Sequence, residues 1–348
     1  MLLDKIPYFD GHNDTLKKVY IKNYDFNLDN TDMHIDLCKI KKSNMMGGFF
    51  AILVPPEKDY QRKLGYGLKV NDKGWEVAYP KAINSSYACH ITLEMINILE
   101  NIIKNNSDFI LIRNKENLID NSHKFKLILH FEGAEAISPS LDNLEYFYNK
   151  GLRSLGIVWS RPNSFGEGVP FRFPSSSDIG KGLTLNGKEL VKQCNKIGIL
   201  IDLSHINMRG FYDVANISTS PLLVTHAAAH SICPSSTNLS DEQIKIIGNS
   251  NGIIGVIFDV LNTRPDGNLQ TDTPIDIVIN HIIHMINIIG EDKVALGSDF
   301  DGGQMPTCLC NICTINNLIK ALSRRGFDRK QIEKVMFKNW INFLKRNL

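Results

Sequence analysis

The stretch Lys126–Ala136, KLILHFEGAEA, is an apolar run that ends at a single carboxylate, Glu132. Residues Leu127–Leu129 and Phe131 have the length and apolar continuity of a strand covered on both faces, as strands of parallel sheets are, although periodicity alone also allows a helix. A charge at the end of a buried strand is costly unless it is paired or binds a metal. We therefore expect Glu132 to have a cationic partner; taken alone, it could equally be an exposed loop residue.

Seven more apolar runs of strand length are spread along the chain, at Ile6–Asp14, Met45–Pro56, Leu152–Trp159, Ile199–His205, Pro221–His230, Gly252–Val260 and Lys293–Asp301. Most are separated by helical spacing of apolar residues, at Ile91–Ile103, Leu144–Lys150, Leu183–Ile197, Leu239–Gly248, Pro274–Ile289 and Arg329–Lys345. This alternation in 348 residues predicts an α/β fold, a single (β/α)8 TIM-like barrel domain over residues 1–348. No internal repeat or linker divides it.

The polar, irregular segment Glu57–Asn84 interrupts the alternation after the second strand. A long connection of this kind often has a function of its own, so we expect a lid or insertion around residues 57–90. The alternative is that its scattered aromatic residues pack on the barrel surface.

The charge pattern excludes some partners. The net charge is +2 and no Lys/Arg-rich block stands out, so we expect no nucleic-acid binding. Residues 1–14 lack the apolar core of a signal peptide, and no apolar run is long enough to span a bilayer. We therefore expect no membrane association and a cytoplasmic location.

The chain has seven cysteines, an odd number without an export signal, so structural disulfides are not expected. Only Cys308, Cys310 and Cys313 are clustered. A structural zinc site would need a fourth ligand that the sequence does not supply nearby, so a reduced loop is the default expectation and metal binding the alternative.

Metal-type ligands follow several of the predicted strands. His12 and Asp14 leave the first strand one residue apart, and residues at i and i+2 of an extended segment point to the same side. His205 and His226 occupy equivalent exits of the fifth and sixth strands, and Glu132 ends the third. Each histidine alone could be structural. Together with Glu132 they predict a reaction centre at the C-terminal face of the barrel, where active sites of this fold lie.

These ligand types suit Zn²⁺, and five ligands exceed the need of one catalytic zinc. If Glu132 bridges two ions about 3.5–4 Å apart, His12 and Asp14 can complete one site, and His205 and His226 the other. A water shared by the two ions would then be hydroxide-like at neutral pH. Asp299, at the end of the eighth strand, is left to orient the hydroxide and carry its proton to a leaving amine. The predicted reaction is metal-assisted amide hydrolysis.

The segment Ser160–Pro174, SRPNSFGEGVPFRFP, is rich in Pro and Gly, so we expect it to form no regular element. It places Trp159, Arg161 and Arg172 near the exit of the fourth strand, where a loop suits substrate contacts.

The sequence resembles the membrane dipeptidase (renal dipeptidase, peptidase M19) family of binuclear zinc peptidases, particularly its bacterial members. The resemblance covers almost the whole chain. It rests on DGHND (10–14), HxD (34–36), HFEGAEAI (130–137), SRPNSFGEGVPFRFP (160–174), IDLSH (201–205), THAAAH (225–230), CPSSTN (233–238), GSDFDG (297–302) and NW (339–340).

The resemblance implies a TIM-like barrel of the metallo-dependent hydrolase type that cleaves dipeptides. It implies two Zn²⁺ per chain, bound by His12, Asp14, Glu132, His205 and His226 with Glu132 as the bridge, and Asp299 as the catalytic acid/base. Family members cleave dipeptides, some with a D-residue at the C-terminal side, and some open β-lactams. The oligomeric state stays open, with a homodimer as one alternative.

Two positions depart from the family pattern. An arginine that binds the free C-terminal carboxylate of the substrate is replaced here by Thr237. A substrate-contacting histidine of mammalian members corresponds to Trp159. We mark both as substrate-binding positions, and Arg161 and Arg172 are the candidates to supply the missing charge.

Two other functions compete with dipeptide hydrolysis. The same bimetallic barrel could hydrolyse another small substrate, such as an acyl amino acid, a lactone or a β-lactam, because a fold does not fix its chemistry. The second competing function is that of a barrel that binds a ligand without turning it over. The intact set of six site residues argues against this function.

Overall fold

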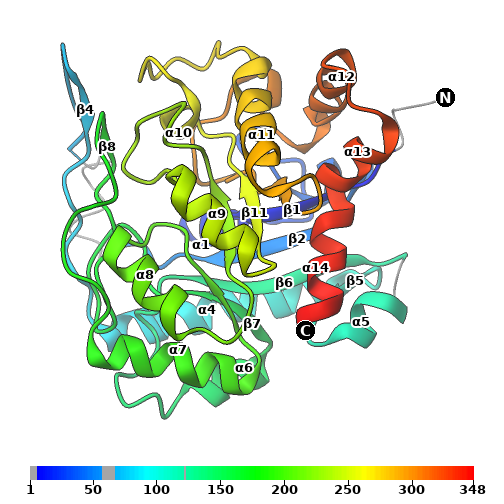
Figure 1. Ribbon diagram of the computed structural model, residues 1–348. Coiled ribbons are helices and arrows are strands. Elements are labelled where there is room, and N and C mark those ends of the chain that lie inside the picture. Colours follow the sequence, from blue (N-terminus) through cyan, green and yellow to red (C-terminus); the bar gives the residue numbers. More distant parts are fainter. Residues whose placement is uncertain (1–5, 57–66, 121–122) are drawn as a thin grey trace.

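Eight parallel strands form a nearly closed barrel in the computed structural model, which describes residues 6–56, 67–120 and 123–348 (Figure 1). In order around the barrel they are β1 (Tyr8–Asn13), β2 (Met45–Ile52), β6 (Phe125–Glu132), β7 (Leu152–Gly156), β9 (Leu200–Asp202), β10 (Leu223–Ala227), β11 (Ile253–Val256) and β12 (Val294–Leu296). Each lies within, or overlaps, one of the eight apolar runs. The predicted barrel is confirmed.

The ring closes between β1 and the segment that follows β12. The amide of Asp299 donates to His12 O at 3.0 Å, and the amide of Asp14 donates to Phe300 O at 2.8 Å. These backbone bonds place the chain after the eighth strand directly beside the chain that leaves the first.

The inside of the barrel holds its own apolar cluster. Seven barrel strands contribute one buried residue each, namely Phe9, Phe49, Ile128, Leu200, Leu223, Ile253 and Ala295. Neighbouring residues on these strands, such as Tyr8 and Phe50, belong instead to the larger cluster beneath the helices. This alternation is the period of two that separates the inner and outer faces of a barrel strand.

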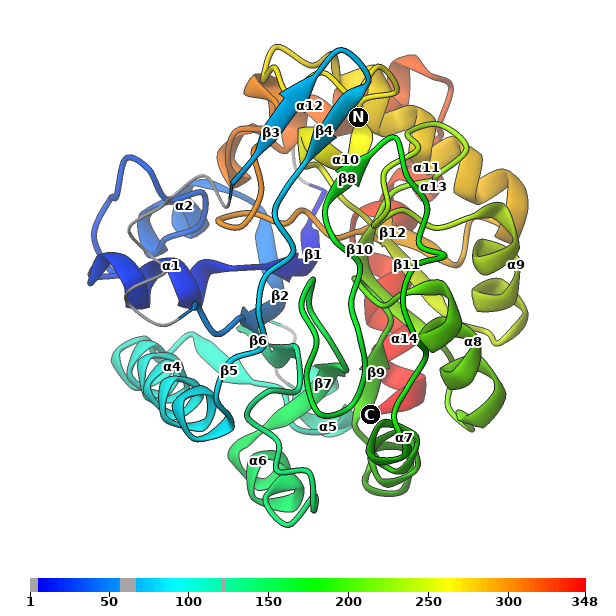
Figure 2. The ribbon, with the colours of Figure 1, turned by 90° about the vertical axis from the view of Figure 1, so that its left-hand side faces the viewer.

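Helices surround the strands (Figure 2). They are α1 (Thr15–Lys22), α2 (Leu37–Lys42), α4 (Ser85–Asn105), α5 (Lys115–Asp120), α6 (Leu144–Lys150), α7 (Leu185–Ile197), α8 (Met208–Ile217), α9 (Asp241–Asn249), α10 (Val260–Thr263), α11 (Ile275–Ile289), α12 (Asn316–Arg324), α13 (Arg329–Glu333) and α14 (Asn339–Asn347). Six of the helical regions were predicted. The predicted closing helix is interrupted by a π-helical turn at Lys334–Lys338.

A second, antiparallel sheet lies at one end of the barrel, opposite α14 (Figures 1 and 2). It consists of β3 (Lys69–Asn71), β4 (Gly74–Glu76) and β8 (Arg172–Phe173). The prediction that residues 160–174 contain no regular element is therefore wrong at β8. Pro and Gly describe only local preference, whereas β8 is held by β4, a partner about a hundred residues away, and by stacking of Phe173 on Trp75.

The predicted lid or insertion is only partly described. Residues 57–66 lie outside the described residues, while β3 and β4 lie within the remainder of the segment. The short strand β5 (Phe109–Leu111), which pairs with residues Phe125–Leu127 at the start of β6, was not predicted either. No helix in the described part of the chain has both the length and the apolar composition needed to cross a membrane.

The Asn339–Trp340 pair fixes α14 across the end of the barrel that lies away from the antiparallel sheet. Trp340 Nε1 donates to Leu296 O at 2.8 Å, and Asn339 Nδ2 donates to Val294 O at 2.7 Å. The Trp340 ring is fully buried and lies 5.0 Å from the ring of Phe49 inside the barrel.

Replacing this indole should destabilise the fold. We expect Trp340→Ala to lower the free energy of unfolding by about 3–5 kcal/mol, because it empties a buried volume at the barrel end. Denaturant titration checks this, with Asn342→Ala, at an exposed position of the same helix, as a control expected to stay within about 0.5 kcal/mol. Equal stability of the two variants would contradict the role given to Trp340.

Candidate active site

The structure brings the five predicted metal ligands together around Glu132. Glu132 Oε2 lies 3.5 Å from His12 Nε2, and Oε1 lies 2.9 Å from His205 Nε2 and 3.8 Å from His226 Nε2. Glu132 is 4% exposed, so its charge is almost completely removed from water. The two carboxylate oxygens thus face different partners, His12 on one side and the two later histidines on the other.

Three buried atoms of this group have no hydrogen-bond partner. They are His12 Nε2, Asp14 Oδ1 and Glu132 Oε2. Buried polar atoms in folded proteins are nearly always satisfied, and several unsatisfied ones in one place call for a specific explanation. Because all three are metal-ligand atoms, a bound cation accounts for them.

Two overlapping triplets could each hold an ion. One consists of His12, Glu132 and His226, and the other of His12, Asp14 and Asp299; within each, the ligand atoms lie within 4.8 Å of one another. Asp299 is thus as close to His12 and Asp14 as a ligand would be, which the sequence analysis did not foresee.

His205 joins the group through its contact with His226. The two Nε2 atoms are 2.8 Å apart, so one of them must carry a proton or the two must share a cation. Since His205 Nε2 also lies 2.9 Å from Glu132 Oε1, a cation held by all three groups satisfies the contacts together.

A second layer of polar residues orients the imidazoles. Thr225 Oγ1 donates to Asp202 Oδ2 at 2.6 Å and lies 2.9 Å from His226 Nδ1, while Ser160 Oγ lies 3.1 Å from His205 Nδ1. Because the Thr225 proton is engaged by Asp202, its oxygen accepts from Nδ1–H of His226, leaving Nε2 of that ring as the ligand atom. The sequence analysis missed these residues, although Asp202 and Thr225 lie within the two histidine motifs.

The backbone is strained at two of the site residues. His205 and Asp299 have φ values of 63° and 62°, in the left-handed region that side chains with a Cβ rarely adopt. Such conformations persist where surrounding contacts over-determine them, and they cluster at functional sites. Both residues lie three positions after the last residue of a barrel strand, β9 or β12, where the chain turns at the end of the barrel.

Clustered carboxylates shift the pKa values of the site residues. Although burial lowers the pKa of His12, the charges of Glu132, Asp299 and Asp14 outweigh it and raise that pKa to about 9. Burial also raises the pKa of Asp299 well above its ordinary value, helped by Asp14, Asp259 and Glu132 and opposed by His12. The centre therefore favours bound cations, and Asp299 favours holding a proton.

A cavity of about 290 Å³ opens onto this centre. Its wall includes Asp14, Glu132, His205 and Asp299, together with Lys17, Asp259, Gln304, Gly302, Gly303 and the apolar residues Leu53, Val77, Pro80, Trp159, Phe171 and Leu261. Trp159 lies on the wall at a ring distance of 6.2 Å from His205. The side chains of Lys17 and Asp259 are charged wall residues to which the sequence analysis gave no role.

Thr237 is not among the residues that line this cavity. Its hydroxyl donates to Asn262 Oδ1, and Asn262 Nδ2 donates to Asp259 Oδ2 at 3.2 Å. Thr237 therefore stands behind Asp259. The predicted contact of Thr237 with substrate stays a prediction.

The two arginines suggested to supply the missing charge have other partners. Arg161 is buried, and its Nε donates to Glu135 Oε1 at 2.6 Å while its guanidinium lies 5.2 Å from the Trp159 ring. Arg172 is exposed and lies 3.3 Å from Glu76. Neither lines the cavity. Arg161 is held by its ion pair with Glu135, and Arg172 lies on β8, which pairs with β4.

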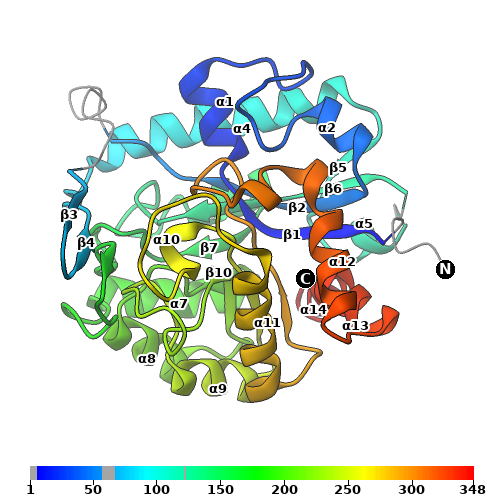
Figure 3. The same ribbon diagram turned by 90° about the horizontal axis from the view of Figure 1, so that it is seen from above.

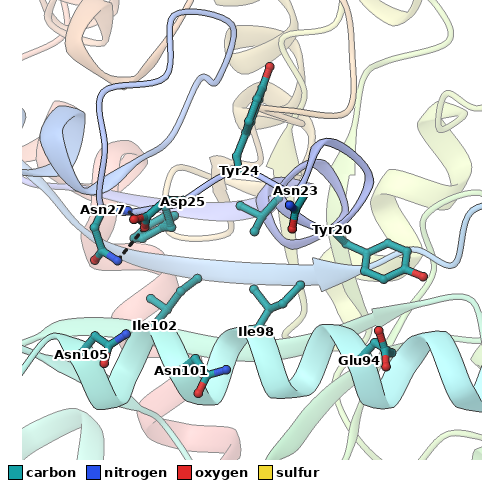
Figure 4. A pocket seen from close by; sticks show the side chains of 12 residues that line it. Tyr20, Asn23, Tyr24, Asp25, Asn27, Glu94, Ile98, Asn101, Ile102 and Asn105 are labelled. Atoms are coloured by element: carbon teal, nitrogen blue, oxygen red, sulfur yellow. Dashed lines mark hydrogen bonds between the residues drawn. The ribbon is translucent and has the colours of Figure 1, made fainter.

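A larger cavity, of about 380 Å³, lies between α1 and α4 (Figures 3 and 4). Its lining is dominated by amides and apolar side chains, including Asn23, Asn101, Asn105 and Ile98, and Asn27 Nδ2 donates to Asp25 Oδ1 at 2.8 Å. It brings together no His, Cys or carboxylate triplet of the kind present around Glu132. We assign the chemistry to the smaller cavity.

The cysteines take no part in either cavity, and all seven are free. Cys308 and Cys313 lie in 3₁₀ turns, Thr307–Leu309 and Ile312–Thr314. Among the described residues no cysteine joins a group of metal ligands. The reduced state of this loop stays a prediction.

The Thr225 hydroxyl should matter for metal affinity. We expect Thr225→Val, which removes the acceptor for His226 Nδ1–H at nearly constant volume, to weaken divalent-metal binding about tenfold to a hundredfold. Competition with a chromogenic chelator measures this. Thr225→Ser keeps the hydroxyl and should bind the metal with the affinity of the parent. If Thr225→Val also keeps that affinity, the hydroxyl of Thr225 is not needed to hold the His226 ring.

Comparisons with known proteins identify the family of this chain. The family model for membrane dipeptidases (peptidase family M19) matches residues 1–347. A metallo peptidase of Rhodobacter sphaeroides, solved with a phosphinate mimic of the dipeptide L-Ala-D-Ala, is 37% identical with a TM-score of 0.94, covering 99% of this chain and 100% of that one. A protein encoded in the pqqA 5′ region of Klebsiella pneumoniae is 42% identical over 63% of this chain and 81% of its own length. Dipeptidase tcpJ of Claviceps purpurea is 26% identical over 97% of this chain and 76% of its own length. The chain belongs to the membrane dipeptidase family, peptidase family M19.

Proposed function

We propose that this protein is a dipeptidase that works with two zinc ions, one held by His12 and Asp14 and the other by His205 and His226, with Glu132 between them. The observation that carries the proposal is the position of Glu132, whose two oxygens face two separate sets of ligand atoms. The unpartnered atoms His12 Nε2, Asp14 Oδ1 and Glu132 Oε2 fit this ligand set.

The substrate class follows from the family and from the cavity. The related Rhodobacter sphaeroides peptidase binds a phosphinate mimic of L-Ala-D-Ala. The cavity of about 290 Å³ in this chain is small and has an apolar wall that includes Trp159 and Phe171. Such a recess suits two amino-acid residues better than a long peptide. The cytoplasmic location and a homodimer remain predictions.

Bound ions would polarise the scissile carbonyl and make water nucleophilic at neutral pH. The remaining work falls to the side chains. Asp299 lies on the cavity wall with a raised pKa, so it can receive a proton and deliver it to the leaving amine. Trp159, wedged between the cavity and the Arg161 guanidinium, shapes the apolar wall and excludes water.

A substrate screen tests the function. Zinc-loaded protein should hydrolyse L,L- or L,D-dipeptides faster than acyl amino acids, lactones or β-lactams, with product amines quantified by chromatography. The proposal is contradicted if a lactone or acyl amino acid is the better substrate, or if no dipeptide is cleaved at verified metal occupancy.

The role of Asp299 has a separate test. Asp299→Asn keeps the size of the side chain and removes the proton carrier, so we expect kcat to fall about 10²–10⁴-fold at matched metal content. Pre-steady-state and steady-state turnover of the best dipeptide measure this.

Asp301→Asn is the local comparison. Asp301 accepts from the amide of His34 at 2.7 Å and from Thr15 Oγ1 at 2.8 Å, so we expect its substitution to reduce stability with much less effect on kcat. If Asp299→Asn retains kcat within a few-fold of the parent, Asp299 does not carry the proton.

A further inference from the structure

We infer that Lys17 binds the free C-terminal carboxylate of the dipeptide, a role that Thr237, which does not line the cavity, cannot fill. This inference rests on the proposed function. It names the residue of this chain that would select peptides with a free carboxylate.

Lys17 is held at the edge of the metal centre. It is the third residue of α1, which starts directly after Asp14, and its side chain lines the cavity and is 18% exposed. Its Nζ forms an ion pair with Asp14 Oδ2, whereas Asp14 Oδ1 is buried and has no partner. Asp14 can therefore contact Lys17 through one oxygen and a metal through the other, so the ammonium group and a bound ion do not compete for the same atom.

The Asp14 oxygen that pairs with Lys17 lies close to Asp299. A methyl group on Gly302 would collide with both Asp14 Oδ2 and Asp299 Oδ1, so these two oxygens face one small space. Asp299 is the proposed proton donor to the leaving amine, and the carboxylate of the released amino acid is only two bonds from that amine. A substrate placed for protonation by Asp299 thus brings its carboxylate toward Lys17.

The opposite flank of Asp299 is unsuitable for a carboxylate. A methyl group on Gly303 would lie 2.9 Å from Asp259 Cγ and 3.0 Å from Asp299 Oδ2, so Asp259 borders that flank with a second carboxylate. Like charges repel strongly in a confined site. Thr237 cannot relieve this repulsion because it lies behind Asn262 and Asp259.

Lys17 is the one cationic side chain among the described residues that line this cavity. Arg161 is buried against Glu135, and Arg172 is exposed beside Glu76. A lysine offers a point charge on a flexible stem rather than the planar fork of an arginine, so it can follow a carboxylate without fixed bidentate geometry.

The test compares one peptide as acid and as amide. For L-Ala-D-Ala, we expect Lys17→Met to lower kcat/KM about tenfold to a hundredfold, the loss of a charge-assisted hydrogen bond. For L-Ala-D-alaninamide, which has no carboxylate, kcat/KM should hardly change. Lys17→Arg should retain most activity on the acid, and Lys22→Met, an exposed lysine in the last turn of the same helix, should match the parent.

Lys17 pairs with Asp14, so its substitution could also change metal affinity. Such a change would affect the acid and the amide equally, because both are cleaved at the same metal centre. The ratio of kcat/KM for the acid to kcat/KM for the amide therefore reports on the carboxylate alone. Calorimetry can compare the dissociation constants of the phosphinate mimic of L-Ala-D-Ala and of its carboxamide. Their ratio measures the same preference for the carboxylate without turnover. If the parent cleaves neither peptide, the proposed function fails, and calorimetry still decides on Lys17. An equal loss on acid and amide in Lys17→Met, or equal binding of the two mimics by the parent, overturns the inference.

Discussion

The burial of the Glu132 carboxylate is the constraint on which the site depends. A charge that is 4% exposed at the end of a central strand is stable only with cationic partners, and the barrel supplies them from strands far apart in sequence. His12 and Asp14 come from the exit of β1, and His205 and His226 from the exits of β9 and β10. Closure of the ring between His12 and Asp299 then sets the predicted proton carrier beside the first pair of ligands. Fold and chemistry are coupled because the bonds that close the barrel also assemble the centre.

Much of the fold could be predicted because each barrel strand is buried on both faces and therefore continuous in apolar residues. The helix predicted at Leu183–Ile197 also ends at Ile197, and Gly198 after it has a left-handed φ of 86°. Other elements have no local signal of this kind. The strand β8 exists only because β4 pairs with it. Helix α8 begins at Met208, directly after Asn207, whose side chain accepts from the amide of Gly210, and it lies in a segment for which no helix was predicted. These elements depend on tertiary partners or on capping that apolar periodicity does not record.

The ligands of the candidate site could be predicted because the exits of the strands meet at one face of a barrel. The contacts of the side chains around these ligands could not be predicted. Sequence spacing gave no sign that Thr237 would stand behind Asn262, or that Arg161 would be buried against Glu135. It also did not show that Asp14, the ion-pair partner of Lys17, and Asp259 would border opposite flanks of Asp299. Side-chain direction in loops depends on contacts between distant segments, and substrate selection depends on those directions.

The central claim is that Glu132 lies between two metal ions. X-ray diffraction from zinc-loaded crystals, with anomalous data collected on both sides of the zinc absorption edge, tests it directly. We expect two zinc peaks per chain, one in contact with His12 and Asp14 and the other with His205 and His226, and Glu132 in contact with both. A single peak at full zinc saturation, or two peaks of which Glu132 touches only one, would contradict it.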